Sequence, residues 1–223
     1  MDKQTFSEAV QRMERSLYRV AMSYTGNVSD AADAVQEALL RAWNRRDTLR
    51  DERYFDTWLM RVVINESKTL LRRRRRVLPM AQPPELRAAE PPGADVALYE
   101  ALFSLPPKYR VPLILTCLDG YTMRETARML GVPEGTVKAR LHAYSSGRDW
   151  ERRKQTMREK DLDRAFGNTP PAFTGRIHQT LAQLEDKPRR IPRLRAALIV
   201  AAVLALLCGI AYAVIMQGQA WYY

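Results

Sequence analysis

Apolar residues recur every three or four positions along most of the chain, and no window alternates apolar and polar residues between turn signals. This period predicts helices throughout. The first clear amphipathic helix starts at Ser29 or Asp30, either of which is a good N-cap. Its apolar face consists of Val35, Ala38, Leu39 and Ala42. Its opposite face consists of Asp33, Gln36, Glu37 and Arg41. That polar face suits either solvent or a partner surface.

A second helix is expected from Phe55 to Arg76. Its apolar stripe consists of Phe55, Trp58, Leu59, Val62 and Leu70. One edge of the other side carries donors with spacing i, i+4, i+7 and i+11, namely Arg61, Asn65, Lys68 and Arg72. The helix then ends in five consecutive arginines. Because phosphate contacts release counterions and arginine suits phosphate geometry, this edge is a candidate nucleic-acid contact.

The stretch between these two helices mixes arginines with aromatic residues. The arginines are Arg45, Arg46, Arg50 and Arg53. The aromatic residues are Trp43, Tyr54, Phe55 and Trp58. Aromatic side chains beside arginines can stack on unpaired bases. Aromatic residues at helical spacing more often pack in a core, so we expect Trp43 and Trp58 to be buried.

Residues 97–144 contain signals for two short helices joined by a tight turn. Thr122 and Glu125 fit a capping box, which starts a helix. The expected buried stripe of that helix consists of Met123, Ala127 and Leu130. Gly131 supplies the turn because glycine adopts positive φ without steric cost, and Pro133 suits the start of the next helix. The pattern predicts a helix-turn-helix.

The second helix of this motif has two faces of different chemistry. The expected inward face consists of Val137, Leu141 and Tyr144. The expected outward face consists of Gly135, Lys138, Ala139 and His142, with Thr136 and Arg140 at its edges. Small residues between long donors let a helix enter a major groove while Lys138 and Arg140 reach bases or phosphates. We expect His142 at the surface and not as a metal ligand.

The net charge of +11 over 223 residues is divided into separate basic blocks. Residues 1–76 carry +5, residues 97–154 carry +4 and residues 155–195 carry +4, whereas residues 77–96 carry −2. The acidic stretch contains five prolines, which favour extended backbone, so it is expected to be a linker. We therefore expect an all-α protein with two small helical domains, 1–76 and 97–154, joined by a Pro-rich linker. Basic patches of this kind indicate phosphate backbones or anionic lipid as partners.

Residues 196–216 carry no charge and are long enough to cross a bilayer core of about 30 Å. They are expected to form a transmembrane helix, with residues 217–223 as a short external tail. The basic residues between Lys187 and Arg195 would keep the preceding domains in the cytoplasm. The lipid bilayer is therefore an expected partner, and the expected location is the cytoplasmic face of the membrane.

The sequence gives little support for a metal site or a catalytic site. The chain has two cysteines, Cys117 and Cys208, and two histidines, His142 and His178, without the spacing of a zinc site or a disulfide framework. Its carboxylates are scattered along helices, and the sequence shows no catalytic arrangement of carboxylate, His and Ser residues. We expect no enzymatic activity, including nuclease activity, and no metal or cofactor.

The motifs of residues 4–143 resemble the two-domain bacterial sigma factors of the extracytoplasmic-function (ECF) type. In the first domain the similar segments are DAADAVQEALLRAW and FDTWLMRVVINESKTLLRRRRR. In the second they are SLPPKYRVPLIL and YTMRETARMLGVPEGTVKARLH. The resemblance implies a region 2-like helical bundle and a region 4-like helix-turn-helix. It also implies a sigma factor that binds core RNA polymerase and directs promoter-specific initiation at −35 and −10 elements.

The resemblance further implies a role for each candidate residue. Core RNA polymerase would bind Asp33, Gln36 and Glu37. The −10 element would contact Arg61, Asn65, Lys68 and Arg72. A flipped base of the non-template strand would lie near the loop 44–53. The −35 element would be read by Glu134, Gly135, Thr136, Lys138, Ala139 and Arg140.

Residues 157–186 resemble the start of a membrane-bound anti-sigma factor, without the zinc pattern of the best-known class. We expect an amphipathic helix here, with Ile177, Leu181 and Leu184 buried and His178 at the surface. An anti-sigma factor is therefore an expected partner, either separate or in cis as residues 155–195. The family pattern ends after His142, which suggests a natural fusion or a frame change joining two reading frames. Without the tail, the protein would be cytoplasmic.

One alternative function is a membrane-anchored helix-turn-helix regulator that binds DNA and never engages polymerase. Such a regulator needs neither the polar face with Asp33 and Glu37 nor the edge from Arg61 to Arg72. The presence of both features favours the sigma factor.

Overall fold

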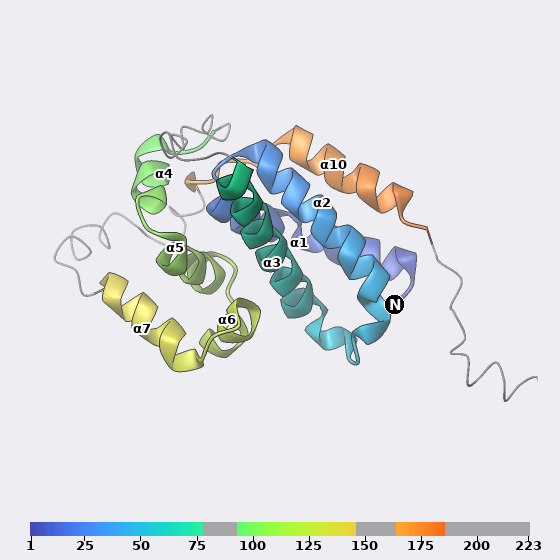
Figure 1. The fold of residues 1–223 in the computed structure, drawn as a ribbon, viewed down its shortest axis with the longest axis horizontal. Helices are drawn as coiled ribbons and strands as arrows, with labels where there is room; N and C mark the ends of the chain where they lie inside the picture. The colour runs from blue at the N-terminus through green and yellow to red at the C-terminus, as the bar shows by residue number, and fades with distance from the viewer. Residues whose placement is uncertain (78–92, 146–163, 186–223) are drawn as a thin grey trace, which may run out of the picture. The chain divides into compact units, whose positions relative to one another are not determined.

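The computed structural model describes residues 1–77, 93–145 and 164–185. All regular elements of these residues are helical, which confirms the all-α prediction (Figure 1). The first domain consists of α1 (Lys3–Thr25), α2 (Val28–Arg45) and α3 (Phe55–Val77), with the 3₁₀ turns η1 (Arg46–Thr48) and η2 (Glu52–Tyr54). The second consists of α4 (Val96–Phe103), α5 (Pro107–Leu113), the π-helical turn η3 (Ile114–Leu118), α6 (Met123–Leu130) and α7 (Glu134–Ser145). Helix α10 (Pro171–Gln183) follows.

The start of α2 lies earlier than the sequence predicts. Asn27, in extended conformation, is the N-cap, and its side-chain oxygen accepts from the backbone N of Asp30 at 2.7 Å. Asp30 is therefore the third residue of the helix, so the choice of Ser29 or Asp30 as N-cap was wrong. The Asp30 carboxylate is buried, where it pairs with Arg74 of α3 and accepts from the Asn27 amide at 2.6 Å. A side chain engaged in this way is not available to cap the helix.

Aromatic rings form the centre of the α1–α3 bundle. Phe6 meets Trp43 edge-on at 5.2 Å between ring centroids, and it meets Phe55 in the same way at 5.4 Å. Trp43 is buried, as predicted. Trp58 is only partly buried and packs on the edge of this core, 6.0 Å from Phe55. The rings of both tryptophans thus contribute to packing between α1, α2 and α3.

The predicted helix-turn-helix is present as α6 and α7. Both halves of the capping box are formed: Glu125 N donates to Thr122 Oγ1 at 3.2 Å, and Thr122 N donates to Glu125 Oε2 at 2.8 Å. The Glu125 carboxylate also accepts from the Thr122 hydroxyl at 2.7 Å, and this bond, followed by the one from Thr122 N, lowers the pKa of the carboxyl. Gly131 ends α6 with φ of 68°, the left-handed conformation expected of it.

The buried side of α6 differs from the prediction at its first position. Met123 is 43% exposed, and the buried residues are Thr126, Ala127 and Met129. Helical side chains point back toward the N-terminus, so the side chain of the first residue extends beyond the start of the helix. Ala127 was predicted correctly, and Leu130 is partly buried against the core.

The two domains and α10 pack together in one compact unit, residues 1–184. Helix α1 contacts α5 and η3, and α3 contacts α6. A buried arginine, Arg110 of α5, donates from Nε to the backbone oxygen of Ser23 in α1 at 3.0 Å. Arg19 of α1 pairs with Asp119, just after η3. Polar side chains therefore link α1 to the second domain across this interface.

The predicted amphipathic helix in the tail is confirmed as α10. Ile177, Leu181 and Leu184 are buried, and His178 is exposed. The helix lies along α2 (Figure 1). None of the helices within residues 1–77, 93–145 and 164–185 has both the length and the apolar character needed to cross a membrane. The expected span 196–216, the external tail 217–223 and most of the expected linker lie outside the described residues.

Candidate nucleic-acid interface

The predicted donors on α3 lie along one edge of that helix. Arg61, Asn65 and Arg72 are exposed, whereas Lys68 is half-buried. The Lys68 ammonium lies 5.9 Å from the centre of the Tyr24 ring. Burial lowers the pKa of Lys68, and so do the positive charges of Arg140, Arg72 and Arg61. An anion placed here would relieve that repulsion.

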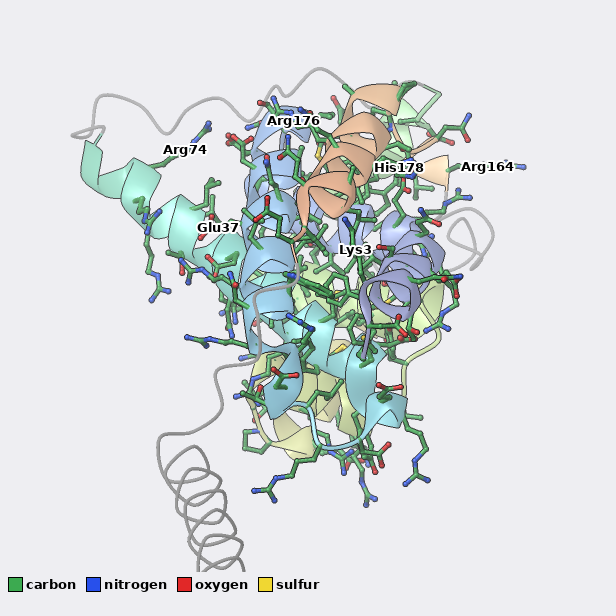
Figure 2. All side chains as sticks on the ribbon, turned by 90° about the vertical axis from the view of Figure 1, so that its right-hand side faces the viewer. Lys3, Glu37, Arg74, Arg164, Arg176 and His178 are labelled. Carbon is green, nitrogen blue, oxygen red and sulfur yellow. The ribbon has the colours of Figure 1, made fainter. Side chains whose placement is uncertain are left out.

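One arginine of the run that ends α3 serves the fold. Arg74 crosses to α2, where it pairs with the buried Asp30 (Figure 2 labels Arg74). Arg72 instead donates to Thr69 Oγ1 of its own helix at 3.2 Å and remains exposed. The run that the sequence suggested as one phosphate contact is thus divided between a packing role for Arg74 and an exposed role for Arg72.

The outward face of α7 matches the prediction. Glu134, Gly135, Lys138 and Ala139 are exposed, and Thr136 and Arg140 are half-buried. Val137 on the inward face is fully buried, and Leu141 is partly buried. The side chain of Tyr144 lies outside the described residues. The helix therefore presents small residues and long donors on the same exposed face.

The structure brings the two candidate DNA-binding helices to one cleft, which the sequence did not predict. A cavity of about 240 Å³ is lined by Lys68 of α3 and Arg140 of α7, with Tyr24 and Lys108 among its other residues. A second cavity, of about 610 Å³, is lined by Arg61 of α3 together with Arg124 and Arg128 of α6. Cations from both domains thus line each of these two cavities.

The polar face of α2 joins a chain of ion pairs. Glu37 accepts from Arg41 at 3.0 Å, and Arg41 also reaches Glu66 of α3 at 2.9 Å. The hydrogen bond that Arg41 donates to Glu37, followed by the charge of Glu66, raises the pKa of Arg41. Asp33, one turn before Glu37, pairs with Arg176 of α10 (Figure 2 labels Glu37 and Arg176). Gln36 is half-buried.

Several residues at these interfaces were missed by sequence reasoning. Glu66 and Arg110 are charged residues on otherwise buried faces, and a charge at an apolar helical position is the signal that could have found them. Arg176 had no such signal, because its partner Asp33 is 143 residues away in the sequence. Only the packing of α10 on α2 reveals that pair.

Comparison with known families decides between the functions considered above. The family model for Sigma-70 region 2 matches residues 9–77, and that for Sigma-70, region 4 matches residues 95–143. The ECF RNA polymerase sigma factor SigM of Mycobacterium tuberculosis is 35% identical over 147 residues, which cover 62% of this chain and 72% of that protein. The chain belongs to the ECF sigma factors. The alternative of a regulator that never engages polymerase is set aside.

Other relatives of this ECF sigma factor give the same result. The RNA polymerase sigma-E factor of Streptomyces coelicolor is 35% identical over 162 residues, covering 71% of this chain and 89% of that protein. SigW of Bacillus subtilis is 28% identical over 159 residues, covering 63% and 85%. Among solved structures, the sigma factor RpoE of Bartonella quintana, in complex with the anti-sigma factor NepR, matches with a TM-score of 0.51. At 19% identity, covering 82% of this chain and 99% of that one, this match supports the fold alone.

Proposed function

We propose that this ECF sigma factor reads the −35 element with the outward face of α7. Gly135 and Ala139 let the helix backbone approach the base edges, and Lys138 and Arg140 extend beyond them as donors. Glu134 and Thr136, at the first turn, lie where the N-terminus of a recognition helix meets the groove. The observation that carries the proposal is the exposure of this face on a helix-turn-helix with its capping box and its turn intact.

The −10 element is assigned to the edge of α3. Arg61, Asn65 and Arg72 are exposed donors on that edge, and Lys68 lies between them with a pKa that an anion would raise. The neighbouring loop 44–53 is a candidate pocket for a flipped base. Arg46 stacks on the Trp43 ring at 3.7 Å, so a planar cation already lies on an aromatic ring beside the loop. Stacking of this kind offsets the energy of extruding a base.

Core RNA polymerase is assigned to the exposed face of α2. Asp33 and Glu37 are exposed carboxylates one turn apart, and Gln36 lies between them. The pairs from Glu37 to Arg41 and from Arg41 to Glu66 connect this face with α3. Because Arg41 pairs with both Glu37 and Glu66, polymerase bound at this face would lie next to α3, the helix assigned to the −10 element.

We expect Lys138→Ala and Arg140→Ala each to weaken binding of a −35 duplex by about 1–3 kcal/mol if the side chain reads a base. The loss should be larger on the preferred sequence than on a scrambled duplex, since a base contact carries sequence information. Arg124→Ala is the matched control, because α6 precedes the recognition helix and its arginine would contact only phosphate. Equal losses on both duplexes, measured by fluorescence anisotropy, would reassign Lys138 and Arg140 to phosphate.

The decisive experiment for the function is run-off transcription with the full chain and core polymerase of the same organism. Templates from a genomic library would reveal promoter-dependent transcripts. Their −35 and −10 sequences should then change the yield independently. Absence of any such transcript, with a chain that still binds polymerase, would contradict promoter recognition by α3 and α7.

We further propose that residues 196–216 anchor this sigma factor in the bilayer, with the DNA-binding domains in the cytoplasm. The support is the uncharged length of the segment and the basic residues before it. The full chain should stay in the membrane fraction after alkaline extraction. Release into the supernatant would contradict the anchor. Intact-mass spectrometry of the extracted polypeptide would distinguish a natural fusion from two separate products.

A further inference from the structure

Helix α10 packs against α1 and α2 of the first domain. Three apolar residues with spacing i, i+4 and i+8 line its inner side: Phe173, Ile177 and Leu181. All three are buried. Phe173 meets the Tyr18 ring of α1 edge-on at 5.0 Å between centroids. Helix α10 contacts both α1 and α2, so its apolar side is covered by the first domain along its length.

Polar contacts on both sides fix the position of α10 on α1 and α2. Toward α1, Thr174 donates to Glu14, and His178 Nε2 lies 3.6 Å from the same carboxylate. Near the end of the helix, Lys3 Nζ donates to the backbone oxygen of Ala182 at 2.9 Å. Figure 2 labels Lys3, Arg176 and His178 around this helix. These contacts specify one orientation, which apolar burial alone would not.

Toward α2, the contact is the pair between Arg176 and Asp33. Asp33 belongs to the surface assigned above to core RNA polymerase. A cation of polymerase that approached Asp33 would be repelled by the positive charge of Arg176 and would compete with it for the carboxylate. Helix α10 lies outside both matched family regions, which end at residue 143, so it is an addition to the two sigma domains.

The residues just before α10 contact the second domain. The backbone oxygen of Arg164 accepts from Asp95 N at 2.9 Å, at the N-cap of α4. Phe166 is buried, and its ring lies 6.2 Å from that of Phe103 of α4. Residues 164–184 therefore touch both DNA-binding domains, and we call this segment the clasp.

The arrangement held by the clasp is not compatible with reading both promoter elements. Elements at −35 and −10 are separated by about 25 base pairs, or about 85 Å of duplex at 3.4 Å per pair. In the structure α3 packs directly on α6, and Lys68 and Arg140 line the same cavity. Helices in contact cannot reach sites that far apart. The domains must separate before the promoter is bound.

We propose that the clasp, residues 164–184, inhibits this sigma factor in cis. It pairs Arg176 with Asp33 on the proposed polymerase-binding face of α2 and holds the two domains in the closed arrangement. Core RNA polymerase must displace it. The proposal rests on the proposed function of the α2 face. When the binding-competent form is a small fraction of the molecules, the apparent affinity falls by that fraction.

The first test uses the full chain, solubilised in detergent, with Ile177→Asp. A carboxylate in the buried position of α10 should release the helix from α1 and α2. We expect core polymerase to bind this variant at least about tenfold more tightly than the wild-type chain. Gln179→Asp is the matched control, because it places the same charge on the exposed side of the same helix. Unchanged or weaker binding by a folded Ile177→Asp chain would overturn the proposal.

A second test locks the clasp without disturbing its apolar side. Glu14 and Thr174 are hydrogen-bonded neighbours, so a short cleavable bismaleimide should join Glu14→Cys and Thr174→Cys. The background would carry Cys117→Ser and Cys208→Ser. Crosslinking should lower the affinity for core polymerase at least about tenfold, and cleavage of the linker should restore it. Equal affinity before and after crosslinking would contradict inhibition by the clasp.

A third measurement separates this proposal from the one on which it rests. Asp33→Ala would be added to the released Ile177→Asp chain. If polymerase binding then falls, Asp33 belongs to the polymerase surface and the clasp competes for it. If binding remains high, the assignment of Asp33 to polymerase is wrong. The crosslinking result alone then decides whether the clasp inhibits by holding the domains closed.

Discussion

Replacing Arg110 with alanine is expected to lower the free energy of unfolding of residues 1–184 by about 3–5 kcal/mol. The Arg110 guanidinium is buried between α5 and α1, and burial lowers its pKa to about 10, so it is still charged at neutral pH. It donates to the backbone oxygens of Ser23 and Phe103, both at 3.0 Å, and stacks 4.1 Å from the Phe103 ring. Its removal leaves these carbonyl groups without that donor and leaves a cavity at the domain interface.

Thermal unfolding followed by circular dichroism checks this prediction. For a chain of this size, a loss of that magnitude should lower the Tm by about 10 °C. Arg124→Ala in the same domain is the control. Its exposed side chain makes a long pair with Glu134, at 3.7 Å, so its effect should be below about 0.5 kcal/mol. Similar melting temperatures for the Arg110→Ala and Arg124→Ala chains would mean that the buried guanidinium contributes little.

The triple replacement of Arg61, Asn65 and Arg72 by alanine is expected to reduce promoter opening by about a hundredfold or more. Each donor is exposed on the same edge of α3, so its loss should leave the fold intact. If each contributes at least about 1 kcal/mol to contacts with the melted strand, the combined loss reaches a factor of a hundred. Lys68 is left in place because its half-buried side chain also packs near Tyr24.

The measurement is permanganate reactivity of the −10 thymines in the complex with core polymerase. It reports unpaired bases, so it separates promoter opening from duplex binding. A control chain with Gln4→Ala, Gln11→Ala and Arg12→Ala removes two amides and one arginine from the exposed face of α1. The control should open the promoter as the wild type does. Normal reactivity with the α3 variant would assign −10 recognition to other residues.

The clasp affects both Arg110 and the α3 edge, so both sets of variants should be measured with the clasp in place and with it released. Arg110 is part of the contact between α5 and α1, so its loss also loosens the closed arrangement. The α3 edge faces the second domain in that arrangement, as the cavity lined by Lys68 and Arg140 indicates. Each variant should therefore be compared in the wild-type chain and in the Ile177→Asp chain. A difference between the two backgrounds reports the contribution of the clasp.

Much of the site could be predicted because its signals are short-range. The capping box of Thr122 and Glu125 is complete within four residues, and Gly131 needs only its own φ to end the helix. The same period of apolar residues placed Val137 inside α7 and Ile177 inside α10, and both are buried. Errors arose at helix ends. Asn27 takes the N-cap position predicted for Ser29 or Asp30, and Met123, the first residue of α6, is exposed. The sequence pattern fixes the ends of a helix less well than its middle, because a terminal turn has flanking helical residues on one side only.

The sequence by itself determined the helices, the faces they present and the family to which the chain belongs, since each depends on residues within a few turns of one another. The tertiary structure decided which faces meet. Asp33 appeared in the sequence as an exposed carboxylate, and the structure pairs it with Arg176 across 143 residues. The α3 edge and α7 looked like independent DNA contacts, and they line a common cavity. Such contacts depend on how whole apolar surfaces fit together, and helical periodicity contains no information about that fit.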